Sequence, residues 1–410
     1  MIKLLKIQRK MASHGAQTSW EWLLFCLLLP LSLMYGLISW LRAVVYRQGW
    51  LPRYRARVPV ISVGNLAVGG TGKTPVVDWL LKEAARQGKR VAVVSRGYGG
   101  SYKAKVGVVA DGTGVCLSAA AAGDEPVLLA RRNPGAIILV ARKRAAGVAY
   151  ATTRFAVDLV VLDDAFQHHA VERDLDLVLL DALRPFGNRW PLPAGLLREF
   201  PRALARADLL LLTRAGADPQ LEPLGLPVYV SRHQLAEEAY RLDGGSQPLL
   251  ALRGLKVFAF AGIGAPQGFF AALQQAGLTL AGCLPLADHC RYSRSLVDKI
   301  NALAENCELL LTTEKDAVKL SGIKFHLPCY LVPMDIQIEN HEAFRAEVQK
   351  LWRPEMRVSP ELMEILACPK CKQAVELAED GLSICCPACR LRYPVRDGIP
   401  VMLLDEASEE

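Results

Sequence analysis

The sequence predicts an α/β fold in which helices cover both faces of a mainly parallel sheet. Apolar, strand-like runs alternate with helical stretches, and these runs are almost continuously apolar, as in strands buried on both faces. A glycine-rich loop also follows the first such run and precedes a helix. The chain has 410 residues, of which 51% are hydrophobic, so it can form two or three domains with substantial cores.

The loop "GNLAVGGTGKTP" starts at Gly64 and ends in the Gly-Lys-Thr of a phosphate-binding loop, G-x-x-x-x-G-K-[ST]. Ala67 stands where that pattern has its first glycine. A buried strand, "VPVISV" (58–63), is expected before the loop and a helix, "PVVDWLLKEAARQG" (75–88), after it. Strand, loop and helix N-terminus together cradle phosphate. We therefore predict a P-loop NTPase-type core that binds ATP through Gly69, Gly70, Thr71, Gly72, Lys73 and Thr74, with Thr74 holding Mg²⁺.

The remaining strands follow in order along the chain. The core strands are expected in "RVAVVS" (90–95), "GAIILVA" (135–141), "DLVVLDD" (158–164), "DLVLLDA" (176–182) and "DLLLLTR" (208–214). After "RLDGGSQP" (241–248) a smaller α/β lobe is expected, with strands in "LKVFAFAGI", "LAGCLPLADH", "CELLLTTEKD" and "PCYLVPMDI". The predicted divisions are a membrane-associated segment (1–57), a P-loop core (58–245), a second lobe (246–352), a linker "WRPEMRVSP" (352–360) and a cysteine-containing domain (358–404).

The uncharged run "WLLFCLLLPLSLMYGLISWL" (22–41) predicts a membrane-associated helix, since twenty apolar residues match a bilayer core of about 30 Å. Basic residues flank both ends, so charge gives no orientation. The nucleotide site must face ATP, which places the C-terminal side in the cytoplasm. Pro30 leaves open a helix that lies in the membrane surface instead of spanning it.

The net charge of +8 suits an anionic membrane or a phosphorylated substrate. No long basic run with interleaved aromatic residues occurs, so we do not expect direct binding of nucleic acid.

Acidic residues follow the predicted strands where a P-loop enzyme needs a second group to organise Mg²⁺. Asp163 and Asp164 end one strand, and Asp181 ends a rival strand. The polar groups of "DDAFQHH", Gln167 and His168, favour the first position, because ligands bind at the C-terminal edge of such sheets. "GDEP" contributes Asp124 and Glu125 before a helix, where Asp124 is alternatively a helix cap. By itself, His289 in "ADHCRY" is better explained by a structural role.

The C-terminal region contains two CxxC pairs, typical of tetrahedral zinc sites. The predicted ligands are Cys368, Cys371, Cys386 and Cys389, and Cys385 competes for one position. About fifty residues form too small a core to be stable alone, so bound zinc would contribute to folding. A metal-free remnant is the alternative. The scattered remaining cysteines indicate a reducing compartment.

With these motifs assembled, residues 20–350 resemble the tetraacyldisaccharide 4′-kinase family, the lipid A kinases of Gram-negative bacteria. The resemblance rests on the ordered set "GNLAVGGTGKTP", "SRGYGG", "GDEP", "DDAFQHH", "LPAGLLRE", "ADHCRY" and "LLTTEKDAVK". It implies MgATP-dependent phosphorylation of the 4′-hydroxyl of a membrane-borne acylated glucosamine disaccharide 1-phosphate, giving lipid IVA, at the cytoplasmic face of the inner membrane. That family also tends to lack the first P-loop glycine; unlike it, this chain has Ala165 where glycine is usual.

The resemblance implies roles for individual residues. Asp163, Asp164 and Glu199 match acids near Mg²⁺, and Arg144 matches a cation near the transferred phosphate. Asp124 and His289 match an acid–imidazole pair that activates the sugar hydroxyl. We assign Glu125, Gln167 and His168 to the nucleotide site. The last fifty residues are similar to small zinc-ribbon proteins related to the companion subunit of tRNA and protein methyltransferases, which implies a binding and stabilising module with a possible protein partner.

Two other functions remain as alternatives. One is a P-loop switch ATPase or metal-delivery protein with the cysteines as partner-binding module. Switch ATPases of that kind carry a lysine early in the loop, where this chain has Val68, which favours the kinase. The other is a scaffold for a methyltransferase, in which the ribbon is the functional part.

Overall fold

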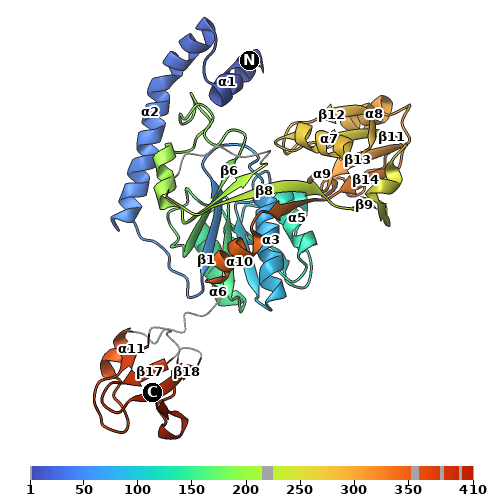
Figure 1. Ribbon diagram of the computed structural model, residues 1–410. Helices are drawn as coiled ribbons and strands as arrows, with labels where there is room; N and C mark the ends of the chain where they lie inside the picture. Colours follow the sequence, from blue (N-terminus) through green and yellow to red (C-terminus); the bar gives the residue numbers. More distant parts are fainter. Residues whose placement is uncertain (1, 215–224, 352–359, 379–382, 397–398, 410) are drawn as a thin grey trace. The chain divides into compact units, whose positions relative to one another are not determined.

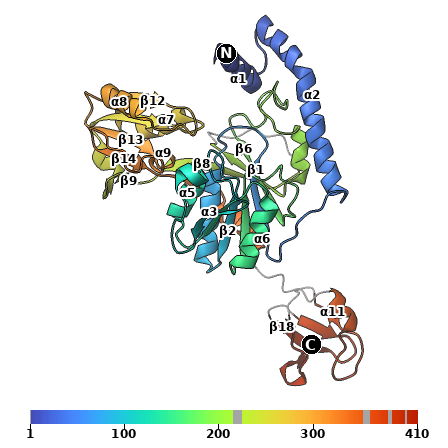
Figure 2. The ribbon, with the colours of Figure 1, turned by 180° about the vertical axis from the view of Figure 1, so that it is seen from behind.

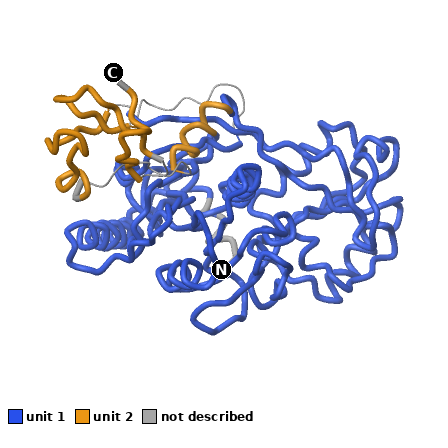
Figure 3. The backbone as a smooth tube through the Cα atoms, turned by 90° about the horizontal axis from the view of Figure 1, so that it is seen from below, with its two compact units in different colours: residues 1–341 blue, residues 342–410 orange. Residues whose placement is uncertain are grey.

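A computed structural model describes residues 2–214, 225–351, 360–378, 383–396 and 399–409. The predicted linker therefore lies, over 352–359, outside the described residues. The chain divides into two compact units, residues 1–341 and 342–410, coloured separately in Figure 3. The two units are described in turn.

The core of the first unit is a sheet that, within the described residues, has nine strands in the order β15-β8-β7-β6-β1-β5-β2-β4-β3. Neighbours from β8 to β4 run parallel, as predicted, whereas β3 and β15 join the two edges antiparallel. The strands are β1 (Val60–Asn65), β2 (Val91–Ser95), β3 (Gly107–Asp111), β4 (Ile137–Val140), β5 (Leu159–Asp163), β6 (Leu175–Asp181), β7 (Leu209–Thr213), β8 (Val228–Leu235) and β15 (Met334–Ile338). The sequence did not predict β3 or β8.

Helices lie against this sheet (Figure 1). Apolar side chains make the contact. Val148 and Ala151 of α6 contact a fully buried layer that includes Val94 and Leu162. The P-loop helix α3 contacts β1, β2 and β5. Because β1 lies at the centre of the sheet, the loop that follows it is held by buried strands on both sides. The helices are α3 (Lys73–Arg86), α4 (Ala119–Ala122), α5 (Asp124–Arg132), α6 (Arg144–Arg154) and the 3₁₀ helix η1 (Pro201–Arg206).

The second lobe contains a separate sheet in which, among the described residues, six strands follow the order β10-β9-β14-β13-β11-β12. Its strands are β9 (Glu238–Arg241), β10 (Ser246–Pro248), β11 (Lys256–Ala261), β12 (Thr279–Pro285), β13 (Leu309–Thr313) and β14 (Cys329–Val332). Its helices are η2 (Leu249–Leu252), α7 (Pro266–Gln275), α8 (Arg294–Leu303) and α9 (Glu314–Ala317). Phe269 and Leu273 of α7 lie in its fully buried core.

The expected boundaries of the second lobe, 246 and 352, are wrong in detail. β9 already belongs to the second sheet, where it pairs with β14. At the other end, β15 leaves the second lobe and pairs with β8 of the first sheet, with Ile336 opposite His233. The run "PCYLVPMDI", expected in the second lobe, contains two strands that belong to two different sheets. Two chain crossings therefore connect the lobes.

Two helices precede the core. α1 (Ile2–His14) is followed by α2 (Ser19–Arg47). Thr18 and Glu21 form a capping box at the N-terminus of α2. α2 is long and apolar enough to cross a membrane by length and composition, and no other described helix meets that test. Figure 2 shows α2 alongside the core. Most of its large side chains are exposed, including Trp20, Trp22, Leu27, Leu37, Ile38 and Trp40.

A narrow stripe of α2 packs against the loop before η1. The Ser32 hydroxyl donates to the carbonyl of Pro191 at 2.6 Å and accepts from the Ala194 N–H at 2.9 Å. One turn later, a Cβ at Gly36 would overlap the ring of Phe200. α1 reaches the same loop, because the Gln8 amide donates to the Pro193 carbonyl at 2.7 Å.

The second unit begins within α10 (His341–Gln349) and contains α11 (Pro360–Ile365) and a small antiparallel sheet. Its strands in the described part are β16 (Glu376–Leu377), β17 (Ser383–Cys386), β18 (Leu391–Arg396), β19 (Ile399–Pro400) and β20 (Ser408–Glu409). The short 3₁₀ helix η3 (Leu404–Glu406) lies between β19 and β20. The most deeply buried side chains of its small core, among the described residues, include Ile384, Tyr393 and Cys368. A core this small is consistent with the expected zinc ribbon.

Candidate active site and metal centre

A cleft of about 1540 Å³ lies at the C-terminal ends of the first sheet's strands, where the second lobe also contributes residues. Its walls include the P-loop, the ends of β2 and β5, and the start of α7. α2 contributes Tyr35, Ser39 and Arg42. The predicted site residues that line it are Gly69, Gly70, Thr71, Gly72, Lys73, Thr74, Glu125, Arg144, Asp163, Asp164, Gln167, His168, Glu199 and His289.

The P-loop turns directly from β1 into α3. Gly69 and Gly72 have φ values of 123° and 78°, which favour glycine, and Gly72 caps the helix that begins at Lys73. The hydroxyl of Thr71 accepts from the Asn65 amide at 2.9 Å, which fixes the loop from inside. The loop therefore has the strand–turn–helix geometry of a phosphate cradle despite Ala67.

Asp163 and Asp164 occupy different electrostatic environments. Asp163 is fully buried, and burial together with the charges of Glu125 and Asp164 raises its pKa to about 6. Its Oδ2 accepts from Ser95 at 3.2 Å, while Oδ1 has no hydrogen-bond partner among the residues that the structure describes. Asp164 is also largely desolvated, which opposes ionisation, but Lys73 and Arg198 outweigh that cost and lower its pKa to about 2. The lysine and Arg198 lie 3.4 Å and 2.7 Å from its Oδ1.

A buried carboxylate oxygen without a hydrogen-bond partner among the described residues, in the same cleft as the helix-start Thr74, fits a hard cation that prefers oxygen ligands. The residues of this edge that fit Mg²⁺ are Thr74, Asp163, Asp164 and Glu199. Glu199 is buried and accepts from Arg206 at 2.9 Å. The rival Asp181 instead pairs with Arg214. The geometry therefore favours the end of β5 over the end of β6.

Arg144 lines the cleft but is almost completely buried. It donates to the backbone carbonyls of Ala141 at 3.0 Å and Asp163 at 2.9 Å, so it fixes the turn after β5. Burial lowers its pKa to about 10, with the charges of Asp163 and Asp164 opposing that shift. It remains a cation at neutral pH. Sequence reasoning did not anticipate this backbone role.

Gln167 and His168 lie on the same turn. The Gln167 amide donates to the Asn65 carbonyl at 3.0 Å and accepts from Arg198 at 3.3 Å. Burial and neighbouring arginines, first Arg144, lower the pKa of His168 to about 4. The imidazole is therefore neutral at pH 7, and its Nε2 is buried without a hydrogen-bond partner.

Asp124 and His289 come from different lobes and meet at the cleft. His289 Nδ1 lies 2.9 Å from Asp124 Oδ1 and 3.1 Å from Oδ2. The hydrogen bond to His289 and the charge of Lys315 outweigh desolvation and lower the pKa of Asp124 to about 2. The same hydrogen bond raises the pKa of His289. Gly123, not Asp124, occupies the N-cap position of α5, although Asp124 Oδ1 also accepts from the Glu125 N–H in the first turn at 3.1 Å.

The structure also shows contacts of charged residues for which the sequence motifs indicated no role. Lys315 donates to Glu125 at 2.7 Å and to Asp288 at 3.2 Å. Arg132 of α5 pairs with Glu314 of the second lobe. The motif "LLTTEKDAVK" includes Lys315 and Glu314, which meet Glu125 and Arg132 only because the lobes dock. Arg198, in "LPAGLLRE", pairs with Asp164 within the first lobe.

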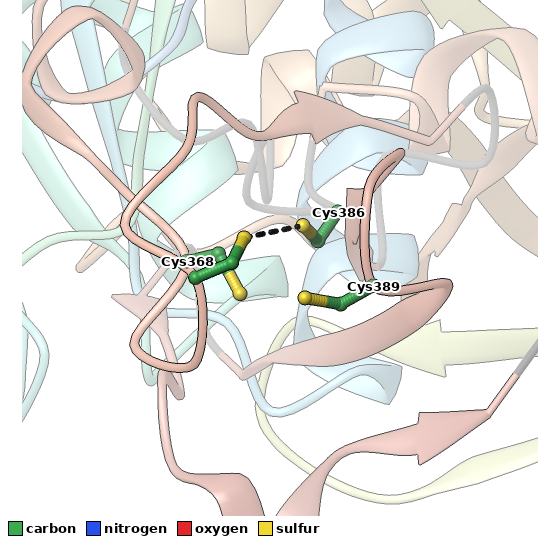
Figure 4. A group of neighbouring side chains, drawn as sticks. Cys368, Cys386 and Cys389 are labelled. Carbon is green, nitrogen blue, oxygen red and sulfur yellow. Dashed lines mark hydrogen bonds between the residues drawn. The ribbon is translucent and has the colours of Figure 1, made fainter.

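In the second unit, four cysteine sulfurs gather at one place. The Sγ atoms of Cys368, Cys371, Cys386 and Cys389 all lie within 4.8 Å of one another. Figure 4 shows Cys368, Cys386 and Cys389 pointing toward a common centre. Zinc–sulfur bonds of about 2.3 Å require this spacing of a tetrahedral set. Cys385, the predicted competitor, is outside the cluster.

Comparisons with known proteins agree with both parts. Residues 24–353 match the family model described as "Tetraacyldisaccharide-1-P 4'-kinase", and residues 359–398 match the model of Trm112p-like proteins. The tetraacyldisaccharide 4′-kinase of Syntrophotalea carbinolica is 52% identical over 335 residues, covering 82% of this chain and 94% of that protein. The kinase of Geobacter sulfurreducens is 42% identical over 346 residues, covering 84% and 98%.

A crystal structure of LpxK from Aquifex aeolicus in complex with ATP superimposes with a TM-score of 0.67 at 30% identity, covering 80% of this chain and 99% of that one. The α/β fold expected from the sequence is confirmed by this similarity. Since the family model and the relatives span more than three quarters of the chain, the chain belongs to the tetraacyldisaccharide 4′-kinase family and carries a C-terminal Trm112p-like domain.

Proposed function

We propose that this family member transfers the γ-phosphate of ATP to the 4′-hydroxyl of tetraacyldisaccharide 1-phosphate, with Asp124 and His289 activating that hydroxyl. The single observation that carries this proposal is the 2.9 Å contact between His289 Nδ1 and Asp124 Oδ1 beside the P-loop cleft. A switch ATPase or metal-delivery protein has no need of an acid–imidazole pair next to its nucleotide site, and neither does a methyltransferase scaffold.

The pair suits a general base. With Nδ1–H donating to Asp124, the Nε2 lone pair of His289 is free to accept the proton of the sugar hydroxyl. The side chain of His289 is 23% exposed, whereas that of Asp124 is 4% exposed, so the imidazole is the member that reaches substrate. The carboxylate orients the ring and stabilises the imidazolium that forms.

The P-loop is proposed to hold the triphosphate, with Lys73 on the terminal phosphates and Arg144 near the phosphate that is transferred. Thr74, Asp163, Asp164 and Glu199 would hold Mg²⁺, which supplies charge neutralisation to the phosphates. Glu125, Gln167 and His168 would complete the nucleotide site. The remaining requirement of phosphoryl transfer is positioning, which the cleft between two docked lobes supports.

We propose further that α2 lies along the membrane surface instead of spanning it. α1 and the middle of α2 contact the same loop of the core, through Gln8 and Ser32. In a spanning helix, Ser32 would lie inside the bilayer, where it could not contact that loop. Exposed side chains of α2 would enter the lipid, while Tyr35, Ser39 and Arg42 face the cleft. With α2 in this position, the protein would lie at the cytoplasmic face of the inner membrane and would receive its lipid acceptor from within the plane of the membrane.

The ribbon is proposed to hold one structural Zn²⁺ through its four clustered cysteines and to offer a surface for a protein partner. The similarity to Trm112p-like proteins supports the second part. The ribbon contributes no residue to the proposed reaction.

The decisive experiment is an assay with γ-labelled ATP and tetraacyldisaccharide 1-phosphate, comparing the natural protein with Lys73→Ala. The expected result is labelled lipid with the natural protein and turnover lowered by orders of magnitude in the variant, with an unchanged unfolding midpoint. Lys89→Ala, in the half-buried loop after the P-loop helix and outside the cleft, is the matched control. Near-normal turnover in Lys73→Ala would remove the P-loop assignment.

A further inference from the structure

Lys319, in the second lobe, is a buried cation that faces Asp124 of the first lobe. Its Nζ lies 3.5 Å from Asp124 Oδ2 and 3.0 Å from Asp316 Oδ1. The ammonium has almost no exposed surface and lies 5.6 Å from the centre of the Tyr292 ring. Burying a lysine is costly unless its charge is compensated, so a cation in this place requires these two carboxylates.

Asp316 fixes where that ammonium lies. Asp316 is fully buried at the start of α9, and its Oδ2 accepts from the Gly262 N–H at 2.8 Å and from the Thr313 hydroxyl at 2.7 Å. Both bonds are internal to the second lobe. Its other oxygen, Oδ1, has no hydrogen-bond partner of standard geometry and faces Lys319 as an ion pair. The rigid carboxylate therefore anchors the lysine from behind.

The two lobes are held in register around this contact. Glu314 accepts from Arg132 Nε at 2.7 Å, and Lys315 donates to Glu125 at 2.7 Å. With Lys319 facing Asp124, three residues within one short segment of the second lobe pair with α5 of the first. Each of these three contacts joins opposite charges, so a shift of this segment along α5 would break the pairs.

We propose that Lys319 is a positioning residue for the dyad: it holds Asp124 ionised and aimed at His289, and by sharing the carboxylate's charge it keeps the imidazole free to accept a proton. The proposal rests on the assignment of Asp124 and His289 as the activating pair. Lys319 touches neither nucleotide nor acceptor in this role. It acts only through Asp124.

Electrostatics supports this role. Within the proposed pair, His289 is the side chain that donates a hydrogen bond to Asp124. The pKa of Asp124 is lowered to about 2, because His289, Lys315 and Lys319 together outweigh the effect of burial. The pKa of His289 is raised by Asp124 and Asp288 and lowered by burial and Lys315. Without the ammonium of Lys319, the full carboxylate charge would act on the imidazole. His289 would then hold its proton to higher pH and be a poorer base at pH 7.

The test is Lys319→Met, which keeps the length of the side chain and removes its charge. Its kcat/KM profile should show an acidic limb displaced to higher pH. At pH 7, kcat should fall between about tenfold and a hundredfold, by analogy with the loss of groups that orient metal-ligating histidines. Affinity for ATP should be unchanged. Lys319→Arg, which keeps the charge, should leave the acidic limb in place even if kcat falls. Lys299→Met, on the exposed side of α8, is the control on the same lobe.

Titration of the His289 ring by NMR, assigned with His289→Gln, provides a measurement that does not depend on activity. The expected result is a higher pKa of His289 in Lys319→Met than in the natural protein. An unchanged ring titration and an unchanged acidic limb would overturn the role of Lys319. If Lys319→Met does not fold, Lys319→Arg decides: a displaced acidic limb in that charged variant contradicts the proposal. Full activity of His289→Gln would refute the dyad itself, which is a different failure.

Discussion

The imidazole of His289 and the carboxylate of Asp124 are joined at 2.9 Å although 165 positions separate them in the chain. One belongs to the second lobe and the other starts α5 of the first, so the pair exists only when the lobes are docked. The proposed activation of the acceptor hydroxyl therefore requires a closed cleft in which both lobes are docked.

Alanine at Asp124 or His289 should lower kcat by about 10² to 10⁴, the range for general base catalysis, with little effect on ATP affinity. The double change should cost barely more than the worse single change, because residues that act as a unit are not additive. Steady-state kinetics and unfolding midpoints of the three variants measure this. Asp298→Ala, exposed on α8, is the control. Fully additive losses, or lost stability with normal kcat, would contradict the pair.

The pH dependence of kcat/KM should follow His289. Its pKa is raised from the ordinary 6.5, first by the hydrogen bond to Asp124, so the neutral base form and the rate should increase as pH rises through a value above 6.5. The charged groups that face the ring are Asp124, Asp288 and Lys315. Asp124→Asn removes the largest stabilisation of the imidazolium, so the acidic limb should move to lower pH while kcat falls. An unmoved limb in Asp124→Asn would show that another group titrates.

The ribbon should contain one Zn²⁺ per chain, measured by metal analysis of freshly purified, reduced protein. Cys368→Ser and Cys389→Ser should lose it, because each removes one of four sulfurs that lie within 4.8 Å. Cys385→Ser, next to a predicted ligand but outside the cluster, should retain it. Removal of residues 358–410 should leave kinase activity, since every proposed catalytic residue lies earlier in the chain. Zinc-free natural protein would contradict this assignment.

Gly36→Leu should release the second half of α2 from the core, because any Cβ at that position overlaps the ring of Phe200. Such overpacking costs about 1–3 kcal/mol when the contact is kept. Hydrogen exchange of the α2 backbone should increase, and the KM for lipid presented in a bilayer should rise with unchanged ATP affinity. Leu37→Phe adds volume on the exposed face and is the control. Unchanged exchange in Gly36→Leu would contradict the docking of α2.

Deletion of residues 1–41 should release the protein from membranes and raise the KM for lipid in a bilayer. The reason is that this segment contains most of the exposed apolar side chains of α2, including Trp20, Leu27 and Ile38. Sedimentation with vesicles and kinetics on bilayer-presented acceptor measure the two effects. Complete sedimentation of the truncated protein would identify another surface as the anchor.

The sequence by itself determined the features that depend on short spacing. The loop from Gly69 to Thr74 follows a strand and starts a helix, so its phosphate geometry is set by a few consecutive residues, and Ala67 did not disturb it. The cysteine pairs likewise bring their sulfurs together through two short turns. In both cases the chemistry lies within one local element, where residue order and backbone preference are sufficient.

Only the tertiary structure decided which distant groups became partners. Periodicity could not show that β15 returns to the first sheet or that Arg198 neutralises Asp164. It could not show that Lys319 reaches Asp124, because "LLTTEKDAVK" reads as an ordinary charged turn after a strand. The contact of Lys319 with Asp124 depends on the docking of two lobes, and Arg198 reaches Asp164 through the packing of a distant loop within the first lobe. Docking is set by shape and charge across surfaces that are far apart in the chain, and local spacing carries no record of it.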